Sequence, residues 1–229
     1  MSAIRSIYKR EMKSYFVSPV AYVVLTIVFI IAGIFFYGYI KDARDANITN
    51  VLSNLAFVFL FLSPFVTMRL IAEEKAIGTL ELLLTSPVTP FQIVMGKFLA
   101  AFSIMLLAIA GTLTYVLILL FHSSMEIGPV ISGYLGLCFL SAAYIGIGLI
   151  ASTFSESQIV AGIVGFGASL LLMLLYSFGG DLVKQISPIS HYLEFANGII
   201  EVKHLVYFLL WAVFCLSVST KAVESRLLK

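Results

Sequence analysis

Charge is scarce in this chain of 229 residues, of which Lys, Arg, Asp and Glu together make up 11%. A typical soluble domain contains about 25% of these residues. Hydrophobic residues account for 61% of the chain, and the mean hydropathy is +1.06. These values exclude a water-soluble domain. They predict an all-α polytopic membrane protein, because helices satisfy their backbone hydrogen bonds internally within lipid.

The chain also lacks the motif needed to bind ATP. It has no G-x-x-x-x-G-K-[ST] phosphate loop, since Gly96-Lys97 has neither the upstream glycine nor the following hydroxyl. Any uphill movement must therefore draw its energy from another subunit. Cysteine is rare as well. Cys138 and Cys215 both fall in apolar runs, which predicts packing residues rather than a disulfide.

Residues suited to a proton relay are missing from the apolar cores of the last four spans predicted below. The three histidines all map to the outer side, and no His-Asp or paired-carboxylate constellation occurs within the spans. We therefore predict a non-catalytic chain with no cofactor-binding or metal-binding residue. Sodium coupling through carbonyls and hydroxyls stays open, although nothing in the sequence favours it.

Six apolar runs are long enough to cross a bilayer, which takes about 20 helical residues. They cover residues 18–40, 52–70, 90–121, 129–153, 158–178 and 204–221. The sequence thus predicts a single transmembrane domain over residues 1–229. Its expected parts are an interfacial helix in 1–17, the six spans in 18–221 and a cytosolic tail in 222–229.

The basic residues set the expected orientation. With the N-terminus in the cytosol, 10 of the 14 Lys and Arg residues fall on the inner side, in keeping with the positive-inside rule. Both termini are therefore expected in the cytosol. The formal net charge of +2 follows from this bias and does not indicate nucleic-acid binding.

Residues 4–16 have the pattern of an amphipathic helix lying in the inner membrane interface. Its apolar face comprises Ile4, Ile7, Tyr8, Met12 and Tyr15, and its polar face Lys9, Arg10 and Lys13. Glu11 departs from this pattern because it projects from the apolar face. Two alternatives fit Glu11. In the first, its carboxylate reaches water or pairs with a nearby Lys or Arg. In the second, it contacts the charged segment from Arg69 to Lys97 or a cytosolic partner.

The segment from Arg69 to Lys97 concentrates charge between two long apolar runs. Glu73, Glu74 and Lys75 lead to Gly78-Thr79, where Thr79 can cap a short helix with Glu81 in its first turn. Leu80, Leu83 and Leu84 share one face of this helix, and Ser86-Pro87 ends it. The pattern predicts a short amphipathic helix at 79–86 that lies parallel to the membrane and presents a docking surface, with an interfacial helix that only closes the loop as the alternative.

The third span begins with a capping box, in which Thr89 caps the helix, Pro90 takes its first position and Gln92 pairs back. A helix over 90–121 would be about 48 Å long at 1.5 Å per residue, which exceeds the roughly 30 Å hydrocarbon core. Its first turns, with Lys97, are therefore expected to project into the cytosolic interface.

The fourth and fifth spans are rich in small residues, which let helix backbones approach closely in lipid. These are Ser132, Gly136, Ala142, Gly146, Gly148, Ala161 and Gly165. We interpret them as internal packing positions, with mobile helix contacts as the alternative. Pro64, within the second span, removes one helical hydrogen bond and is expected to bend that helix.

A further short helix is predicted on the outer side, within 179–203. Ser187-Pro188 resembles a helix start and Asn197-Gly198 a stop. The helix is expected to dip into the outer leaflet as a re-entrant segment, with Pro188, His191, Glu194 and Gly198 as its candidate site residues. His191 and Glu194 have a spacing that metal ligands also use, but no further ligand lies nearby in sequence.

The charged segment resembles the signature of ABC-2 type transporter permeases, and the order of features extends this resemblance over essentially the whole chain. The matching residues are Arg69, Glu73-Glu74-Lys75, Gly78-Thr79-x-Glu81, Leu82-Leu83, Pro87 and Gly96-Lys97. The tail resembles the subgroup of gliding-motility and copper-site-maturation permeases. Its matching residues are Ser187-Pro188-x-x-His191, Gly198 and Tyr207-Phe208.

The resemblance implies a half-size permease in the cytoplasmic (inner) membrane of a prokaryote. A second copy or a homologue would complete a dimer, and two cytosolic ABC ATPase subunits would hold the ATP and Mg. It also implies that the loop helix is the coupling helix, with the N-terminal helix beside it. The implied coupling residues are Arg69, Glu73, Glu74, Lys75, Gly78, Thr79, Glu81 and Leu83, with Tyr8, Lys9, Arg10 and Glu11 on the N-terminal helix.

Three functions remain open at this point. The first is export of an amphiphile, a lipid-linked molecule or a similar cargo, driven by the partner ATPase. The second is mechanotransmission, in which ATP-driven force passes to a periplasmic partner without transport. The third is a membrane scaffold without energy coupling, which leaves the charged segment without a purpose.

Overall fold

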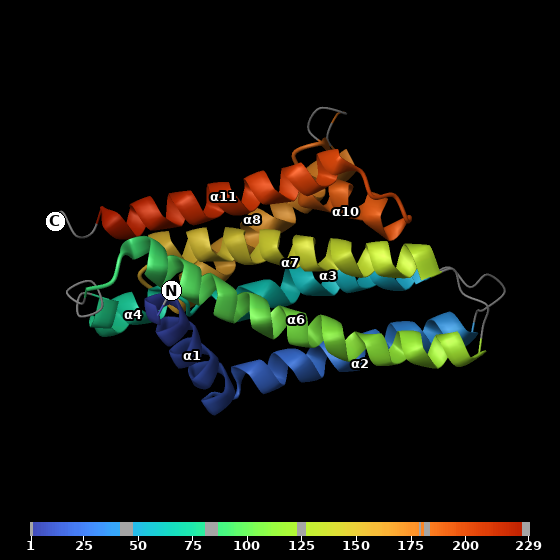
Figure 1. The fold of residues 1–229 in the computed structure, drawn as a ribbon, viewed down its shortest axis with the longest axis horizontal. Helices are drawn as coiled ribbons and strands as arrows, with labels where there is room; N and C mark the ends of the chain where they lie inside the picture. Colours follow the sequence, from blue (N-terminus) through green and yellow to red (C-terminus); the bar gives the residue numbers. More distant parts are fainter. Residues whose placement is uncertain are drawn as a thin grey trace.

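The computed structural model describes residues 2–41, 48–80, 87–122, 127–178, 180 and 184–225. Within these ranges every regular element is an α-helix (Figure 1). The first four are α1 (Ser2–Val17), α2 (Val20–Lys41), α3 (Ile48–Thr67) and α4 (Ala72–Ile77). The others are α6 (Pro90–His122), α7 (Ile127–Phe154), α8 (Gln158–Phe178), α10 (Pro188–Ala196) and α11 (Val202–Glu224).

Six stretches of the described residues are helical, long and apolar enough to cross a membrane, which confirms the predicted number of spans. They run over Val20–Gly38, Val51–Ile77, Pro90–Ile118, Ile127–Phe154, Gln158–Phe178 and Val202–Glu224. The predicted tail begins inside the last helix, since α11 continues to Glu224. The chain is therefore a multi-pass membrane protein.

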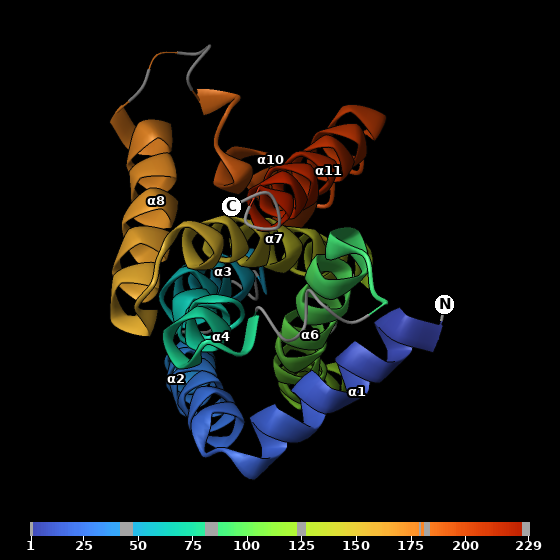
Figure 2. The ribbon, with the colours of Figure 1, turned by 90° about the vertical axis from the view of Figure 1, so that its left-hand side faces the viewer.

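Helix α7 is the centre of the bundle and packs against α3, α6, α8, α10 and α11 (Figures 1 and 2). Its glycines allow this, because an added Cβ at Gly136, Gly146 or Gly148 would lie within 3.0 Å of a neighbouring side chain. The neighbours are Phe195 of α10, Cys215 of α11 and Thr67 of α3 respectively. Internal packing is thus confirmed for these three glycines.

Helix α1 crosses the end of the bundle at a steep angle to the long helices and packs on α6 (Figure 2). Ile7 and Tyr15, from its predicted apolar face, are buried. Tyr8 reaches Ser103 on α6, with their hydroxyl oxygens 3.1 Å apart. The apolar face thus packs against protein, which leaves Lys9 and Lys13 exposed on the other side.

Helix α6 begins as the capping box predicts. The Thr89 amide donates to the Gln92 side-chain oxygen over 3.1 Å, and the Gln92 amide donates back to the Thr89 hydroxyl over 3.4 Å. Helix α10 also keeps its predicted ends: Ser187 precedes it, Pro188 is its first residue and Asn197 follows its last. Gly198 then has a φ of 91°, a left-handed conformation that favours glycine. That α10 dips into a leaflet stays a prediction.

Candidate functional site

The turn between α3 and α4 is held by Arg69. Its guanidinium donates to Glu73 over 3.0 Å, to Ser18 over 2.8 Å and to Ser14 over 3.2 Å. It also lies 5.7 Å from the centre of the Tyr15 ring. Since Ser14, Tyr15 and Ser18 belong to α1 and the bend after it, one side chain joins three parts of the chain.

Tyr15 fixes the same junction from the α1 side. Its hydroxyl donates to the Val66 carbonyl over 2.6 Å in a fully buried contact. Burial raises the pKa of Tyr15, which keeps the hydroxyl protonated as a donor. The end of α3 is therefore tied to α1 by a neutral hydrogen bond as well as by Arg69.

Helix α4 is anchored to the end of α7. The amides of Ile71 and Ala72 both donate to the Ser152 hydroxyl over 3.0 Å, and this hydroxyl donates onward to the Met68 carbonyl over 3.3 Å. Lys75 donates through its ammonium to the Thr153 carbonyl. These contacts satisfy the first amides of a six-residue helix, which has no side-chain cap of its own.

A buried ionic cluster joins α1, α4 and α6. The Lys97 ammonium on α6 lies 3.0 Å from Glu11 of α1 and 3.0 Å from Glu74 of α4, and this lysine is 1% exposed. Arg10 contacts the same two carboxylates at 3.0 and 2.5 Å. We name Arg10, Glu11, Glu74 and Lys97 the four-residue cluster. Its two cations balance its two carboxylates.

The ion pairs of the cluster change the pKa values of Glu11 and Arg10. Burial alone would raise the pKa of Glu11, but attraction and hydrogen bonds to Lys97 and Arg10 outweigh it and lower that pKa. The same carboxylates raise the pKa of Arg10 against the opposing effect of its burial. The second oxygen of Glu74, Oε2, is buried without a hydrogen-bond partner among the described residues. One carboxylate oxygen of the cluster is therefore left without a donor among the described residues.

Three expectations change here. Lys97 does not project into the interface, because α1 lies across the first turns of α6 and buries it. Both alternatives for Glu11 hold, since it pairs with the neighbouring Arg10 and also contacts the charged segment through Lys97. Glu73, Glu74 and Lys75 do not form a loop leading to a helix, since they are themselves α4.

The other predicted coupling residues lie around or beyond this cluster. Gly78 ends α4 with a φ of 75°, so it takes a left-handed conformation. Thr79 is exposed and donates to the Glu74 carbonyl over 3.4 Å. Glu81 and Leu83, and with them most of the predicted coupling helix at 79–86, lie outside the described residues.

A second site occupies the opposite end of the bundle. His191 of α10 and His204 of α11 face each other with their Nδ1 atoms 2.6 Å apart. A metal ion between them would need about 4 Å, at about 2.0 Å per ligand bond. The described residues contain no group of three His, Cys, Asp or Glu side chains that could hold a metal ion. Glu194 influences His191 through its charge. Sequence reasoning missed His204, because its partner lies across a helix break and no local pattern links them.

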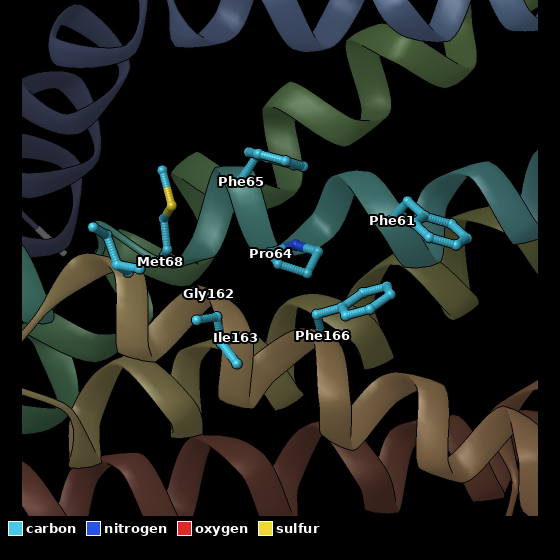
Figure 3. A pocket seen from close by; sticks show the side chains of 8 residues that line it. Phe61, Pro64, Phe65, Met68, Gly162, Ile163 and Phe166 are labelled. Atoms are coloured by element: carbon cyan, nitrogen blue, oxygen red, sulfur yellow. The ribbon is translucent and has the colours of Figure 1, made fainter.

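An apolar groove runs between α3 and α8 near the end of the bundle that holds α4 (Figure 3). Its volume is about 570 Å³. The Phe61 and Phe166 rings meet across it with their centres 5.1 Å apart. Figure 3 shows the Pro64 ring lining the groove, where α3 continues as a helix to Thr67. The lining residues are Phe61, Pro64, Phe65, Met68, Ile159, Gly162, Ile163 and Phe166.

The described residues thus combine six helices that are long and apolar enough to span a membrane with a charged junction at one end of the bundle. Residues 5–223 match the ABC-2 family transporter protein model, so the chain belongs to this family. Membership makes it a permease of a generally non-catalytic kind, and it implies an ABC ATPase partner and a dimeric arrangement. No curated protein compared with the chain matches it.

Proposed function

We propose that this chain couples ATP hydrolysis by a separate cytosolic ABC ATPase to export of an amphiphilic cargo across the cytoplasmic membrane. ATP and Mg belong to the partner, and α4 and both termini face the cytosol. The four-residue cluster is the observation that carries the proposal. It connects α4 to α1 and α6 through one buried lysine.

The geometry supports a specific route for the motion. A displacement of α4 moves Glu74, which pulls on Lys97 in α6, and Lys97 in turn holds Glu11 of α1. A second path leads from α4 through Arg69 to the end of α3. Because buried ion pairs are costly to break, the three helices should move as one body when the ATPase shifts the loop.

The exposed end of α4 offers a contact for that ATPase. Ile77 is 67% exposed at the last position of the helix, beside the exposed Gly78 and Thr79. Glu74, by contrast, is turned inward and its side chain is only 13% exposed. We therefore assign docking to the tip of α4 and the segment after it, and transmission to the cluster behind it.

Ile77→Asp should weaken binding of the ATPase at least about tenfold, or about 1.4 kcal/mol, because a carboxylate replaces an apolar contact. The measurement is copurification and titration with the cognate ABC ATPase. Ile127→Asp is the matched control, since Ile127 is 60% exposed at the opposite end of the bundle. Unchanged affinity of Ile77→Asp would refute the docking assignment.

The groove between α3 and α8 is the proposed entry for the apolar part of the cargo. Its lining is apolar, and it lies on the helix that leads directly into Arg69 and α4. Movement of α4 would therefore reshape the groove. An acyl chain or another apolar tail fits such a lining, whereas a small ion would lose its hydration without compensation.

Gly162→Leu should fill the groove and reduce transport severalfold. The side chain is tolerated, because a Cβ at Gly162 would lie 3.5 Å from Met68, an ordinary contact distance. Transport of a fluorescent amphiphile into liposomes that carry the complex gives the measurement. Gly167→Leu on the same helix is the control, since nothing lies within 4 Å of a Cβ there. Equal transport by both variants would remove the groove from the route.

The same liposomes test the alternative of mechanotransmission to a periplasmic partner. ATP turnover without movement of any candidate cargo would favour that function. A second copy of this chain or a homologue completes the proposed dimer, and membrane lipid surrounds it. The likeness of the tail to gliding-motility and copper-site-maturation permeases stays part of this proposal, since the family match does not reach the subgroup.

A further inference from the structure

The contacts of the two histidines determine which nitrogen atoms carry hydrogen. His191 Nε2 lies 2.9 Å from the Gln185 carbonyl, which can only accept, so Nε2 carries the hydrogen. In a neutral His191 the Nδ1 atom is then an acceptor. His204 must donate from its own Nδ1 across the 2.6 Å bridge. The neutral pair thus shares one bridging hydrogen.

The remaining nitrogen, His204 Nε2, is left with a lone pair. His204 is 4% exposed, and its Nε2 has no hydrogen-bond partner among the described residues. A single added proton can be accommodated with the bridge intact, because one ring still accepts from the other. A second proton cannot, since it places two N–H groups and two positive charges face to face at 2.6 Å.

We propose that the histidine pair is an acid-sensitive latch: double protonation releases the start of α10 from α11. The bridge is one of a few contacts that join these segments. His191 stacks on Tyr207 with ring centres 3.8 Å apart, and the Tyr207 hydroxyl donates to the Ile186 carbonyl over 2.6 Å. Breaking the bridge therefore loosens the turn at 185–187 as well as His191 itself.

The far half of α10 should stay in place. Tyr192 donates to the Leu52 carbonyl over 2.7 Å, and Phe195 packs on Gly136 of α7. Both side chains are fully buried. Release of the first turn around a fixed second half is a hinge-like movement at the end of the bundle opposite α4 (Figure 1).

The direction of the pH response follows from burial and the neighbouring charges. Burial and the charge of Lys203 lower the pKa of His191, whereas the Gln185 carbonyl and Glu194 raise it. The net shift of this pKa is downward. A group with a lowered pKa stabilises the latched state fully above its ordinary pKa of about 6.5. That contribution is lost as the pH falls from there towards the lowered pKa.

Few other ionisable groups face the pair. Glu201 precedes α11 and contacts Lys203 at 2.5 Å, and Lys184 stands one residue before Gln185. Helices α3, α7 and α8, which pack on α10, contain no Asp, Glu, Lys, Arg or His. Helix α6, which packs on α11, has Lys97 in the cluster at the other end, and the side chain of its His122 lies outside the described part.

The only tryptophan of the chain provides a probe. Trp211 stacks on Tyr207 with ring centres 5.8 Å apart, on the continuation of the stack that begins at His191. The experiment follows Trp211 emission of the full chain in phosphatidylcholine nanodiscs between pH 8 and pH 4.5, on the order of two units around the histidine pKa. Hydrogen exchange of residues 186–196 is measured in parallel.

The wild type should show an emission transition centred below about pH 6.5, with about tenfold faster exchange of the first turn of α10 after correction for the intrinsic rate. The transition should vanish in H191Q/H204Q and persist in H122Q. Two charge variants that keep both histidines give an independent check. E194Q should shift the midpoint of the emission transition to lower pH, and K203Q should shift it to higher pH. Four results would each overturn the latch. The first two are the absence of a transition in the wild type and a transition that persists in H191Q/H204Q. The other two are midpoints that neither charge variant shifts and a change in emission without faster exchange.

Discussion

Lys97→Met should destabilise the chain by about 3 kcal/mol, because it removes one of two cations from a buried cluster with two carboxylates. This is the lower end of the usual range of about 3–5 kcal/mol, since Arg10 still contacts both Glu11 and Glu74. The expected fall in Tm is roughly 6–12 °C. Thermal unfolding of the purified chain in detergent measures it.

A triple variant separates charge balance from shape. Glu11→Gln and Glu74→Gln, added to Lys97→Met, leave no carboxylate in the four-residue cluster, and Arg10 bears its charge at 50% exposure. Most of the lost stability should return. If the cluster also transmits motion, cargo-stimulated ATPase activity of the complex should stay low in this stable variant. A wild-type Tm for Lys97→Met alone would show that the buried cluster does not form.

The spans and helix ends could be predicted because their causes are local. Apolar length specifies the membrane helices, and the Thr89–Gln92 exchange and the Ser187-Pro188 start depend on neighbours a few residues apart. Gly198 could be predicted as a stop for the same reason. These features need no knowledge of what lies across the bundle.

The cluster could not be assembled from the sequence in this way. Glu11 and Lys97 are 86 positions apart, and only the crossing of α1 over α6 brings them together. Charged side chains normally reach water, so a buried lysine is not expected. For this reason the length of the third span predicts Lys97 in the membrane interface. The misplaced Glu11 on an apolar face was the one available signal, because a carboxylate there needs a cation.

Ser152 and His204 illustrate a different limit. Both are polar residues within apolar helices, where a serine hydroxyl often bonds only to the backbone of its own helix. The Ser152 hydroxyl instead accepts hydrogen bonds from two backbone amides at the start of α4. Nothing in the sequence around Ser152 or His204 distinguishes them from the other serines and histidines, so their partners appear only once the helices are packed.

The crossing of α1 over α6 depends on Gly96, the residue before Lys97. A Cβ at this position would lie 2.8 Å from Ile7 Cγ2, 2.9 Å from Ile7 Cβ and 3.2 Å from the Ile4 carbonyl. The first two distances are shorter than side chains tolerate, and the third involves backbone. The Gly96-Lys97 pair therefore combines two requirements of one contact: room for α1 and a cation for Glu11.

Gly96→Ala should consequently displace α1 while the spans stay folded. Overpacking costs about 1–3 kcal/mol, which corresponds to about 5–150-fold more frequent opening of this contact. Hydrogen exchange over residues 4–16 measures it, and cargo-stimulated ATPase activity should fall with it, since Glu11 leaves Lys97. Gly167→Ala is the matched control: it makes the same helical substitution with nothing within 4 Å, so it should stabilise α8 by about 0.8–1 kcal/mol. Exchange in α1 that is the same in both variants would mean that Gly96 does not set the approach of α1 to α6.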